Sequence, residues 1–488
     1  PIMTISSTST STHATRRTKI VATVGPASRD KDHIKALIEA GVNVFRLNFS
    51  HGTYDEHEAV LHTIRETAKE LSTPTAILQD LSGPKIRITN VKGDYLSIHD
   101  EDEVFLKLSH GEVTDQSTIY VGGLDPAKVL QPGHQVLLAD GILVLQAIAI
   151  EGDAVRCTIT KGGRIRSRVG IAFPDSDIGL PATTEKDLQD LSWGVKHAVD
   201  YVAISFVNNA QDVLQLREAI DQQGGHAHII AKIERKSALQ NIYEILDVSD
   251  GLMVARGDLG LELPLAQVPR VQKRLIEEAN FRGIPVIVAT QMLHSMITAV
   301  RPTRAEVSDI ATAVMSGADA VMLSEETAIG EHPTLAVEHL SRIAYEAEGE
   351  FDFANYRPRL RNADTQTIPD AVAYAACAAA VKVEASAVIA CTETGTSARL
   401  IAKYRPQQPL FGVSSSITTL RRMSLYWGVI PLLFEAPETH ENELETALRK
   451  VQQLYNFDNG SRAVITGGLS VRTPGSTSVM EIREMSYL

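Results

Sequence analysis

Residues 16–88 alternate short apolar runs with amphipathic segments of helical period. Strands separated by helices of about 10–15 residues are typical of βαβ units on a parallel sheet. The three apolar runs of this segment are Thr18–Gly25, Val42–Ser50 and Ala76–Leu81. The pattern therefore predicts an α/β domain that begins at about residue 16.

The pattern changes between residues 89 and 171. Short runs with alternating apolar positions follow one another there, interrupted by turn residues, and few segments have a helical period. Closely spaced short strands with turn signals between them indicate a small all-β unit. We predict that residues 89–171 form a β domain inserted into the α/β domain.

The α/β rhythm then returns and continues to about residue 345. Five further apolar runs alternate with helix-length segments: Asp200–Val207, His228–Glu234, Gly251–Leu259, Pro285–Met292 and Ala318–Ser324. Together with the first three runs they make eight, the number of strands in a (β/α)8 barrel. We predict such a TIM barrel from residues 16–88 and 172–345, with an open doubly wound sheet as the alternative.

A third unit covers residues 346–488. An Ala-rich helical segment is followed by apolar strand candidates, a pattern that predicts a smaller, separate α/β domain. These segments are Ile368–Val383, Ala387–Cys391, Leu410–Val413, Val429–Phe434 and Arg462–Thr466. At the other end, residues 1–15 are rich in Ser and Thr without an apolar core, so we expect a disordered lead-in and no secretory signal.

Bulk composition narrows the class of protein. The 488 residues are 44% hydrophobic and 22% charged, which excludes an intrinsically disordered chain. No apolar run reaches the about 18 residues of a membrane span. The net charge of −13, from 47 basic and 60 acidic side chains, argues against a broad nucleic-acid surface. Three widely spaced cysteines fit neither a disulfide framework nor a zinc site, so the expected compartment is a reducing cytoplasm.

Charged and polar side chains gather at the carboxyl ends of the predicted barrel strands. This edge carries the active site in TIM barrels, and such a group is costly to desolvate unless it binds a ligand. For any single residue, a strand end that simply reaches solvent is the alternative. The set is Arg46, Asn48, Ser50, Asp80, Lys232, Glu234, Arg256, Gly257, Asp258, Thr290, Gln291, Ser324, Glu325 and Glu326.

Two carboxylates and three cations at this edge point to phosphoryl chemistry. Glu234 and Asp258 end neighbouring predicted strands, and Mg²⁺ is commonly held by one or two carboxylates with water and phosphate. The side chains of Arg46, Arg87 and Lys232 can bind phosphate oxygens. Phosphoryl transfer depends mainly on positioning and charge stabilisation, which this set supplies. The chain has neither glycine-rich phosphate loop, G-x-x-x-x-G-K-[ST] or G-x-G-x-x-G.

These motifs resemble the pyruvate kinase family over nearly the whole chain. The matching segments are RLNFSHG (46–52), DLSGPKIR (80–87), AKIER (231–235), MVARGDLG (253–260), ATQMLHSM (289–296), PTRAEVSD (302–309) and MLSEETAIG (322–330). The resemblance implies Mg²⁺- or Mn²⁺-dependent phosphoryl transfer from phosphoenolpyruvate to ADP, giving pyruvate and ATP. It also implies a β lid, a regulatory C-terminal domain and a homotetramer.

The resemblance also assigns roles to residues of this sequence. Two cations would contact the phosphoryl group, two carboxylates would hold the divalent ion, and a turn would fix the substrate carboxylate. The assigned residues are Arg46, Lys232, Gly257, Asp258 and Thr290 for substrate; Lys232, Arg46, Thr290, Ser324 and Glu326 for catalysis; Glu234 and Asp258 for the metal; and Asn48, Ser50, His51 and Arg87 for the nucleotide.

One departure from the family pattern bears on the monovalent cation. Potassium-dependent relatives carry a motif similar to D-T-K-G-P-E-I-R-T, whereas this chain has Leu81, Lys85 and Ile88 in place of Thr, Glu and Thr. An ammonium group can supply the positive field that K⁺ supplies elsewhere, so we expect K⁺ not to be required. A solvated surface lysine is the alternative. The expected neighbours of Lys85 are Asn48, Ser50, Asp80 and Leu81.

A hydroxyl-rich loop in the third unit opens a predicted helix, a position that can bind phosphate. Its residues are Thr392, Thr394, Gly395, Thr396 and Ser397. By resemblance the loop would bind a sugar-phosphate or nucleotide effector. A plain helix cap is the alternative, because Ser and Thr are favoured there in any case, and Glu393 would oppose an anion.

Two other functions stay open for this sequence. A Mg²⁺-dependent barrel lyase or aldolase acting on pyruvate or phosphoenolpyruvate would share Glu234 and Asp258, but would leave Arg46 and Arg87 unexplained. A catalytically silent regulatory homologue would share the fold, although the intact Lys232 argues against it.

Overall fold

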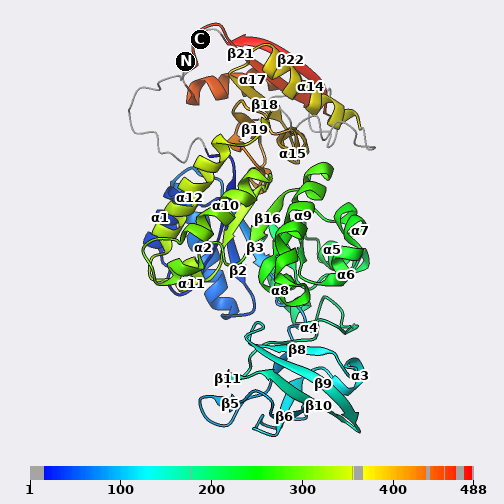
Figure 1. Ribbon diagram of the computed structural model, residues 1–488. Coiled ribbons are helices and arrows are strands. Elements are labelled where there is room, and N and C mark those ends of the chain that lie inside the picture. Colours follow the sequence, from blue (N-terminus) through cyan, green and yellow to red (C-terminus); the bar gives the residue numbers. More distant parts are fainter. Residues whose placement is uncertain are drawn as a thin grey trace.

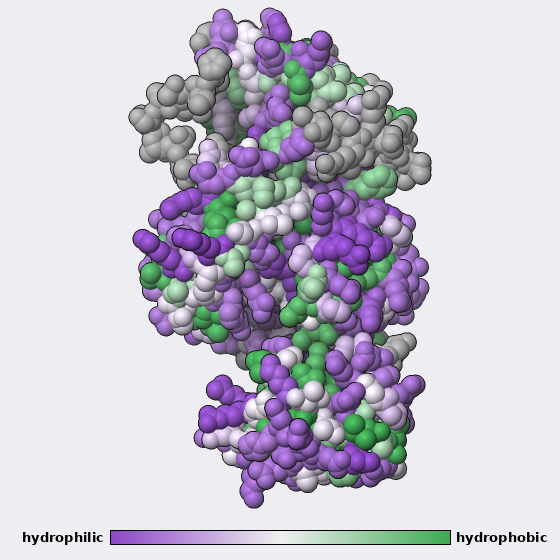
Figure 2. Space-filling model, viewed as in Figure 1, coloured by the Kyte–Doolittle hydropathy of each residue, from purple (hydrophilic) through white to green (hydrophobic). Residues whose placement is uncertain are grey.

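The computed structural model describes residues 16–176, 178–353, 356, 367–435, 440–455, 457–468 and 477–485. The predicted lead-in at residues 1–15 lies outside them. Three units follow one another along the long axis of the molecule, with the barrel between the C-terminal domain and the inserted β unit (Figure 1). Hydrophilic side chains predominate on all three units on the face shown in Figure 2, and the molecule narrows where the β unit joins the barrel.

Eight parallel strands close into a barrel in the order β1-β17-β16-β15-β14-β13-β3-β2. The predicted (β/α)8 barrel is therefore confirmed, and the open-sheet alternative is wrong. The strands are β1 (Lys19–Thr23), β2 (Val44–Asn48), β3 (Ala76–Asp80), β13 (Tyr201–Ile204), β14 (His228–Ile233), β15 (Gly251–Ala255), β16 (Val286–Ala289) and β17 (Ala320–Leu323).

Helices surround the barrel. Four of them begin with a capping box. In this motif a Thr or Asn side chain, and an acidic side chain three residues later, accept hydrogen bonds from the first backbone N–H groups of the helix. The longer helices are α1 (Lys31–Glu39), α2 (Tyr54–Glu70), α4 (Glu185–Lys196), α5 (Ala210–Gln222), α7 (Ile242–Val248), α9 (Val268–Arg282), α10 (Arg304–Met315) and α12 (Pro333–Gly349). Shorter ones are α6 (Lys236–Gln240), α8 (Arg256–Glu262), α11 (Glu325–Ala328), η2 (Leu265–Gln267) and η3 (His294–Ile297).

The barrel strands are buried on both faces, which explains their continuous apolar runs. Successive side chains point to opposite faces of a strand. Ile77 and Val202 pack among the residues beneath the helices, whereas their neighbours Leu78 and Ala203 fill the barrel interior. The interior is therefore a packed core, and polar groups are displaced to the strand ends.

One predicted strand continues into a helix. The prediction extends from Gly251 to Leu259, but β15 ends at Ala255 and α8 starts at Arg256. The Gly257 N–H donates to the Thr290 hydroxyl at 2.8 Å and makes no bond to a neighbouring strand. The prediction extended past the polar residues Arg256 and Asp258 to the buried Leu259, although these polar residues mark the end of the apolar strand.

The inserted unit consists of a seven-stranded sheet in the order β12-β8-β9-β10-β6-β7-β4 and the pair β11-β5. Fully buried Val104, Leu106, Val136 and Val155 contribute to a core of its own, as the sequence predicts for a separate β unit. Its elements are β4 (Arg87–Ile88), β5 (Leu96–Ile98), β6 (Glu103–Leu108), β7 (Thr118–Gly122), α3 (Pro126–Val129), β8 (Gln135–Leu138), β9 (Leu143–Glu151), β10 (Ala154–Lys161), β11 (Gly163–Ile165) and β12 (Ile171–Ala172).

The C-terminal domain is a five-stranded sheet in the order β20-β19-β18-β21-β22 with helices beside it. The sequence did not predict β22, which runs antiparallel to β21 and has only its two end residues, Thr477 and Met485, buried. The elements are α14 (Ile368–Lys382), β18 (Ala387–Cys391), α15 (Thr396–Lys403), β19 (Leu410–Ser414), α16 (Ile417–Met423), β20 (Val429–Leu433), α17 (His440–Leu454), β21 (Ser461–Gly468) and β22 (Thr477–Met485). None of the described helices is long and apolar enough to cross a membrane.

A buried arginine joins this domain to the floor of the barrel. Arg405 donates to Asp319 at 2.8 Å and to Asn280 at 2.9 Å, and its guanidinium carbon lies 4.8 Å from the centre of the Trp427 ring. Asp319 in turn accepts from the Val286 N–H at 2.9 Å. The ion pair therefore connects the start of two barrel strands to the segment after α15.

We expect Arg405→Met to lower the free energy of unfolding by about 3–5 kcal/mol, because it leaves the Asp319 carboxylate buried without its cation. Urea unfolding followed by circular dichroism would measure the loss. Arg270→Ala, which removes an exposed arginine of α9, is the matched control. A change of less than about 1 kcal/mol for Arg405→Met, as for an exposed ion pair, would contradict the assignment.

Candidate active site

Four charged side chains from three strands meet at the carboxyl end of the barrel. Arg46 on β2 donates from Nε to Asp80 Oδ2 at 2.7 Å. Lys232 on β14 lies with its Nζ 3.2 Å from Asp80 Oδ1 and 3.0 Å from Glu234 Oε1. Asp80 and Glu234 are almost completely buried, so the four side chains form one desolvated ionic group at the barrel mouth.

The charges in this group control one another's ionisation. Burial by itself would lower the pKa of Lys232, but the carboxylates of Asp80 and Glu234 more than offset this and raise it above its usual value. Burial would raise the pKa of Asp80, but Lys232 and Arg46 together hold it below its usual range. Lys232 is therefore a permanent cation at neutral pH, with its charge balanced by carboxylates.

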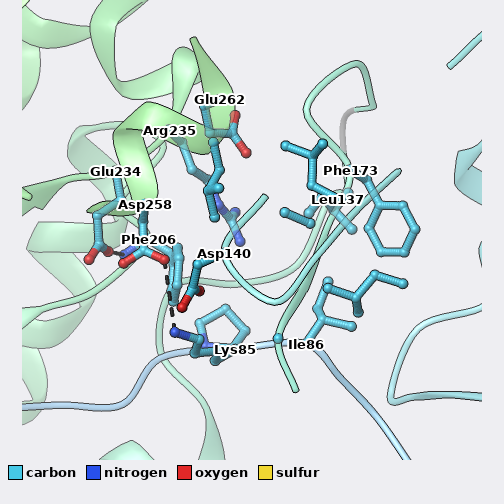
Figure 3. Close-up of a pocket in the computed structure, with 16 residues that line it drawn as sticks. Lys85, Ile86, Leu137, Asp140, Phe173, Phe206, Glu234, Arg235, Asp258 and Glu262 are labelled. Carbon is cyan, nitrogen blue, oxygen red and sulfur yellow. Dashed lines mark hydrogen bonds and ion pairs between the residues drawn. The ribbon is translucent and has the colours of Figure 1, made fainter. Parts of the chain in front are cut away.

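Glu234 and Asp258 lie beside each other on one wall of a pocket between the barrel and the β unit (Figure 3). Burial raises the pKa of Glu234, Lys232 opposes this shift, and the carboxylate of Asp258 adds to it. Glu234 also accepts from the Phe206 N–H at 2.6 Å. Two carboxylates that repel each other are hard oxygen donors of the kind that Mg²⁺ and Mn²⁺ prefer, so this pair fits a divalent ion.

Lys85 points into the same pocket from below Asp258 in the view of Figure 3. Its Nζ lies 3.9 Å from Asp258 Oδ1. Asp258 is not among the four neighbours that the sequence predicts for Lys85. One of those four, Asp80, is instead bound by Arg46 and Lys232. The Lys85 ammonium group therefore lies beside Asp258, one of the two carboxylates of the Glu234–Asp258 pair.

Thr290 follows β16 in a strained conformation. Its φ is 72° and that of Gln291 is 55°, a left-handed region that β-branched residues rarely adopt. Two bonds hold it there: the Gly257 N–H donates to the Thr290 hydroxyl, and Arg256 donates to the Thr290 carbonyl at 2.7 Å. Arg256 is itself fixed by Asp309 at 2.6 Å. The structure thus brings Gly257 and Thr290 together, and Arg256 positions the turn.

Glu326 is buried and its carboxylate is occupied by backbone groups. It accepts from the Leu293 N–H at 3.0 Å and from the Ser324 N–H at 2.7 Å. Glu325, by contrast, is exposed and lies 3.9 Å from His294. Glu326 therefore fixes the segments after β16 and β17, while Ser324 stands at the end of β17.

The four residues predicted for the nucleotide lie on two elements. Asn48, Ser50 and His51 are at the end of β2 and in the loop after it, where the Asn48 side chain accepts from the Ser50 N–H at 3.2 Å. Arg87 is in β4, at the base of the inserted unit, and donates to the Arg168 carbonyl at 2.9 Å.

Sequence reasoning missed Ser205, which directly follows β13. Its hydroxyl accepts from Lys232 Nζ at 2.7 Å and donates to the Leu81 carbonyl at 2.7 Å. It therefore holds the ammonium group together with the two carboxylates. The sequence contained a signal for it: Ser205 is a polar residue inside the apolar run Asp200–Val207, near the carboxyl end of a predicted barrel strand.

The predicted effector loop is distant from this site, on the side of the barrel away from the β unit (Figure 1). Its hydroxyl groups bind one another and nearby backbone: the Thr392 hydroxyl accepts from the Gly395 N–H at 2.9 Å, and the Ser397 hydroxyl bonds to that of Thr477. The five residues of the prediction, Thr392, Thr394, Gly395, Thr396 and Ser397, lie in the loop after β18 and in the first turn of α15.

Comparison with known proteins gives consistent results. The family description "Pyruvate kinase, barrel domain" matches residues 15–337, and "Pyruvate kinase, alpha/beta domain" matches residues 370–483. Curated pyruvate kinases of Staphylococcus aureus strains USA300 and NCTC 8325 are each 40% identical over 471 residues, covering 96% of this chain and 80% of theirs. The crystal structure of a pyruvate kinase from Cryptosporidium parvum superposes with a TM-score of 0.91 at 33% identity, covering 97% of each chain.

The depressed pKa of Asp80 generates a prediction about acid stability. The carboxylate stabilises the fold above its unfolded pKa of about 4, and this contribution is lost as the pH falls through the lower folded value. Asp80→Asn should therefore have a lower melting temperature than the wild type at pH 6, and the difference should shrink by pH 3. Scanning calorimetry of both proteins measures this, and a difference that does not change with pH would contradict it.

Proposed function

The chain belongs to the pyruvate kinase family, so it is a phosphotransferase, and from this premise we propose which of its residues transfer the phosphoryl group of phosphoenolpyruvate to ADP. The observation that carries the proposal is the buried Lys232 ammonium, fixed by Asp80, Glu234 and Ser205 at the barrel mouth. A cation held in this way costs no reorganisation when negative charge develops beside it.

Lys232 and Arg46 are the two cations that bind the phosphoryl group. Arg46 donates to Asp80 and, at 3.0 Å, to the Thr23 hydroxyl, which fixes the plane of its guanidinium. Planar guanidinium groups bind phosphate oxygens in pairs, and lysine acts as a point charge. With a raised pKa, Lys232 keeps its proton and stabilises the transferring phosphoryl group and the enolate electrostatically.

The substrate carboxylate is bound by the turn around Thr290. The Gly257 and Asp258 N–H groups and the Thr290 hydroxyl are the donors, and the 2.8 Å bond between Gly257 and Thr290 supports their convergence. The strain at Thr290 is consistent with a residue held in place for a ligand.

The family implies a divalent metal ion such as Mg²⁺. Glu234 and Asp258 are the residues that would hold it, and when bound it would neutralise charge on the phosphoryl and enolate oxygens. The Phe206 N–H and Lys232 keep the Glu234 carboxylate in one orientation.

The enolate receives its proton through a water molecule held by Thr290 and Ser324. Both residues stand at the ends of neighbouring strands, β16 and β17. Glu326, whose carboxylate accepts two backbone N–H groups, acts in our proposal as a positioning residue for Ser324.

Asn48, Ser50, His51 and Arg87 bind the phosphates of ADP. Because Arg87 belongs to the first strand of the inserted unit, closure of this unit as a lid would bring the cation toward the nucleotide. Closure would also exclude water, which otherwise competes with ADP as acceptor.

Potassium is not required in this proposal. The Lys85 ammonium, 3.9 Å from Asp258, already supplies a positive charge inside the site. Because the Lys85 ammonium lies beside Asp258, its positive charge offsets the negative charge of the Glu234–Asp258 pair directly.

The remaining proposals concern the enzyme in the cell. We propose a cytoplasmic homotetramer that takes part in glycolysis, with a sugar phosphate or nucleotide as a candidate effector at Thr392–Ser397. The three cysteines are buried thiols, which suits a reducing compartment.

Lys232→Met should lower kcat for pyruvate formation by at least about 10²–10³-fold, since it removes a preorganised positive group. A coupled assay of ADP-dependent pyruvate formation from phosphoenolpyruvate, with and without Mg²⁺, measures the effect. Lys236→Met, an exposed lysine at the start of α6, is the matched control and should remain fully active. Near-normal turnover of Lys232→Met would refute the role, and no turnover by the wild type would favour a silent homologue.

The wild type should reach full activity in buffer with tetramethylammonium as the only monovalent cation. Lys85→Glu should then depend on added KCl, because the substitution places a second negative charge beside Asp258. The rate of pyruvate formation against KCl concentration tests both proteins, with Lys85→Met separating loss of the positive charge from gain of a negative one. Wild-type activity that is lost without K⁺ and restored by KCl would contradict the proposal.

A further inference from the structure

Two histidines and a glutamate gather on the outside of the barrel, between helices α2 and α4. Glu58 and His62 are one helical turn apart on α2, so their side chains share a face. His197 is the residue at the C-terminal end of α4. One carboxylate oxygen and one nitrogen of each ring lie within 4.8 Å of one another.

The three side chains are close without being hydrogen-bonded. Nε2 of His62 is 3.7 Å from one oxygen of Glu58, and Nε2 of His197 is 4.0 Å from the other. Both distances exceed those of a hydrogen bond. The carboxylate thus lies between two ring nitrogens and leaves a gap in which a ligand of all three could sit.

His197 provides a second, independent observation. Its side chain is only 8% exposed, and its Nε2 is a buried atom without a hydrogen-bond partner. Leaving such a group unsatisfied costs about 1–3 kcal/mol, and a native structure usually has a reason for it. The unpartnered nitrogen faces Glu58.

The ring of His197 also makes an aromatic contact. It packs against Trp193 of α4 in a tilted arrangement, with the ring centres 4.4 Å apart and an angle of 31° between the planes. Helices α2 and α4 are fastened to each other by the Tyr54 hydroxyl, which donates to Asp190 at 2.8 Å. One ligand nitrogen is therefore preorganised, while the more exposed Glu58 and His62 can adjust.

We propose that Glu58, His62 and His197 form a binding site for a divalent transition-metal ion of the Zn²⁺ class, separate from the active site. Two imidazoles and a carboxylate are a common zinc donor set, with water in the fourth position of the tetrahedron. Metal–ligand distances of about 2.0–2.2 Å require donor atoms about 3.3–3.6 Å apart. Rotation of the Glu58 and His62 side chains, which are more exposed than His197, closes the remaining gap.

The donor set distinguishes this site from the one at the barrel mouth. Mg²⁺ prefers oxygen ligands in an octahedron and binds imidazole poorly, whereas Zn²⁺, Ni²⁺ and Cu²⁺ favour it. Burial lowers the pKa of His197, so the ring is neutral at pH 7, which is the form that binds metal.

Occupation would connect the helices on either side of the inserted unit. In the chain, α2 precedes β3 and the β unit, and α4 follows the unit on its return to the barrel. An ion that binds only the folded protein stabilises it in proportion to the logarithm of its concentration over Kd. We expect Zn²⁺ to raise the melting temperature of the full-length protein.

Isothermal titration with Zn²⁺ in excess Mg²⁺ tests the site directly. The wild type should bind one Zn²⁺ more tightly than His62→Ala or His197→Gln does, by at least tenfold. His110→Ala, an exposed histidine of the β unit, is the matched control and should bind like the wild type. Glu234→Gln should keep the binding, since the substitution lies at the barrel mouth and not between α2 and α4. Equal affinity in all variants, or loss of binding only in Glu234→Gln, would overturn the proposal.

Trp193 offers an optical measurement at the same site. The chain has two tryptophans, and Cu²⁺ bound to His197 should quench the emission of the one packed against it. The quenching should vanish in Trp193→Phe and in His62→Ala. Because His62 is exposed, His62→Ala should melt at the wild-type temperature in EDTA, which separates loss of the site from loss of the fold. Full quenching in His62→Ala would contradict the site.

Discussion

The active site depends on the burial of one ammonium group between two carboxylates. Lys232 lies 3.2 Å from Asp80 and 3.0 Å from Glu234; the two carboxylates are nearly inaccessible to solvent, and the lysine side chain is 12% exposed. Removing any one of them would leave an uncompensated charge in a region of low dielectric, which costs several kcal/mol. The geometry of the mouth is thus set by the same forces that keep the barrel end folded, and substrate binding need not organise it.

The charge balance at the barrel mouth bears on how a chain with a net charge of −13 can bind two anionic substrates. Arg46 and Lys232 do not create a free positive patch, because Asp80 and Glu234 neutralise them in the folded protein. A site that is nearly neutral by itself is stable without substrate. The excess positive charge that anions require would come from the divalent ion and from Lys85, while surplus acids on the surface favour solubility.

The sequence was sufficient for the architecture because each barrel strand is buried on both faces and therefore appears as a continuous apolar run. The end of β15 was predicted wrongly because the run was extended past the polar Arg256 and Asp258 to the buried Leu259. Ser205 was missed because it is one small polar residue within an apolar run, and its importance comes from a lysine 27 positions later. Strand β22 was missed because only Thr477 and Met485 at its two ends are buried, so it has no apolar run.

Contacts between distant segments are where sequence reasoning fails most clearly. Motif position indicates that Lys85 is near the site, but only the fold shows that its partner is Asp258. Glu58 and His197 are separated by the whole inserted unit, and no spacing rule connects them. The spacing of two ligands within one helix, such as Glu58 and His62, can be recognised in the sequence. The position of a third ligand on another helix depends on how the helices pack and cannot be recognised there.

Strand β17 joins the floor of the barrel to its mouth over only four residues. Asp319, just before the strand, pairs with Arg405 of the C-terminal domain, and Ser324, just after it, stands at the mouth. The four residues between them are buried, and a shift of closely packed residues would disturb the core. Because the strand is this short, variants of the floor should be examined for turnover as well as for stability.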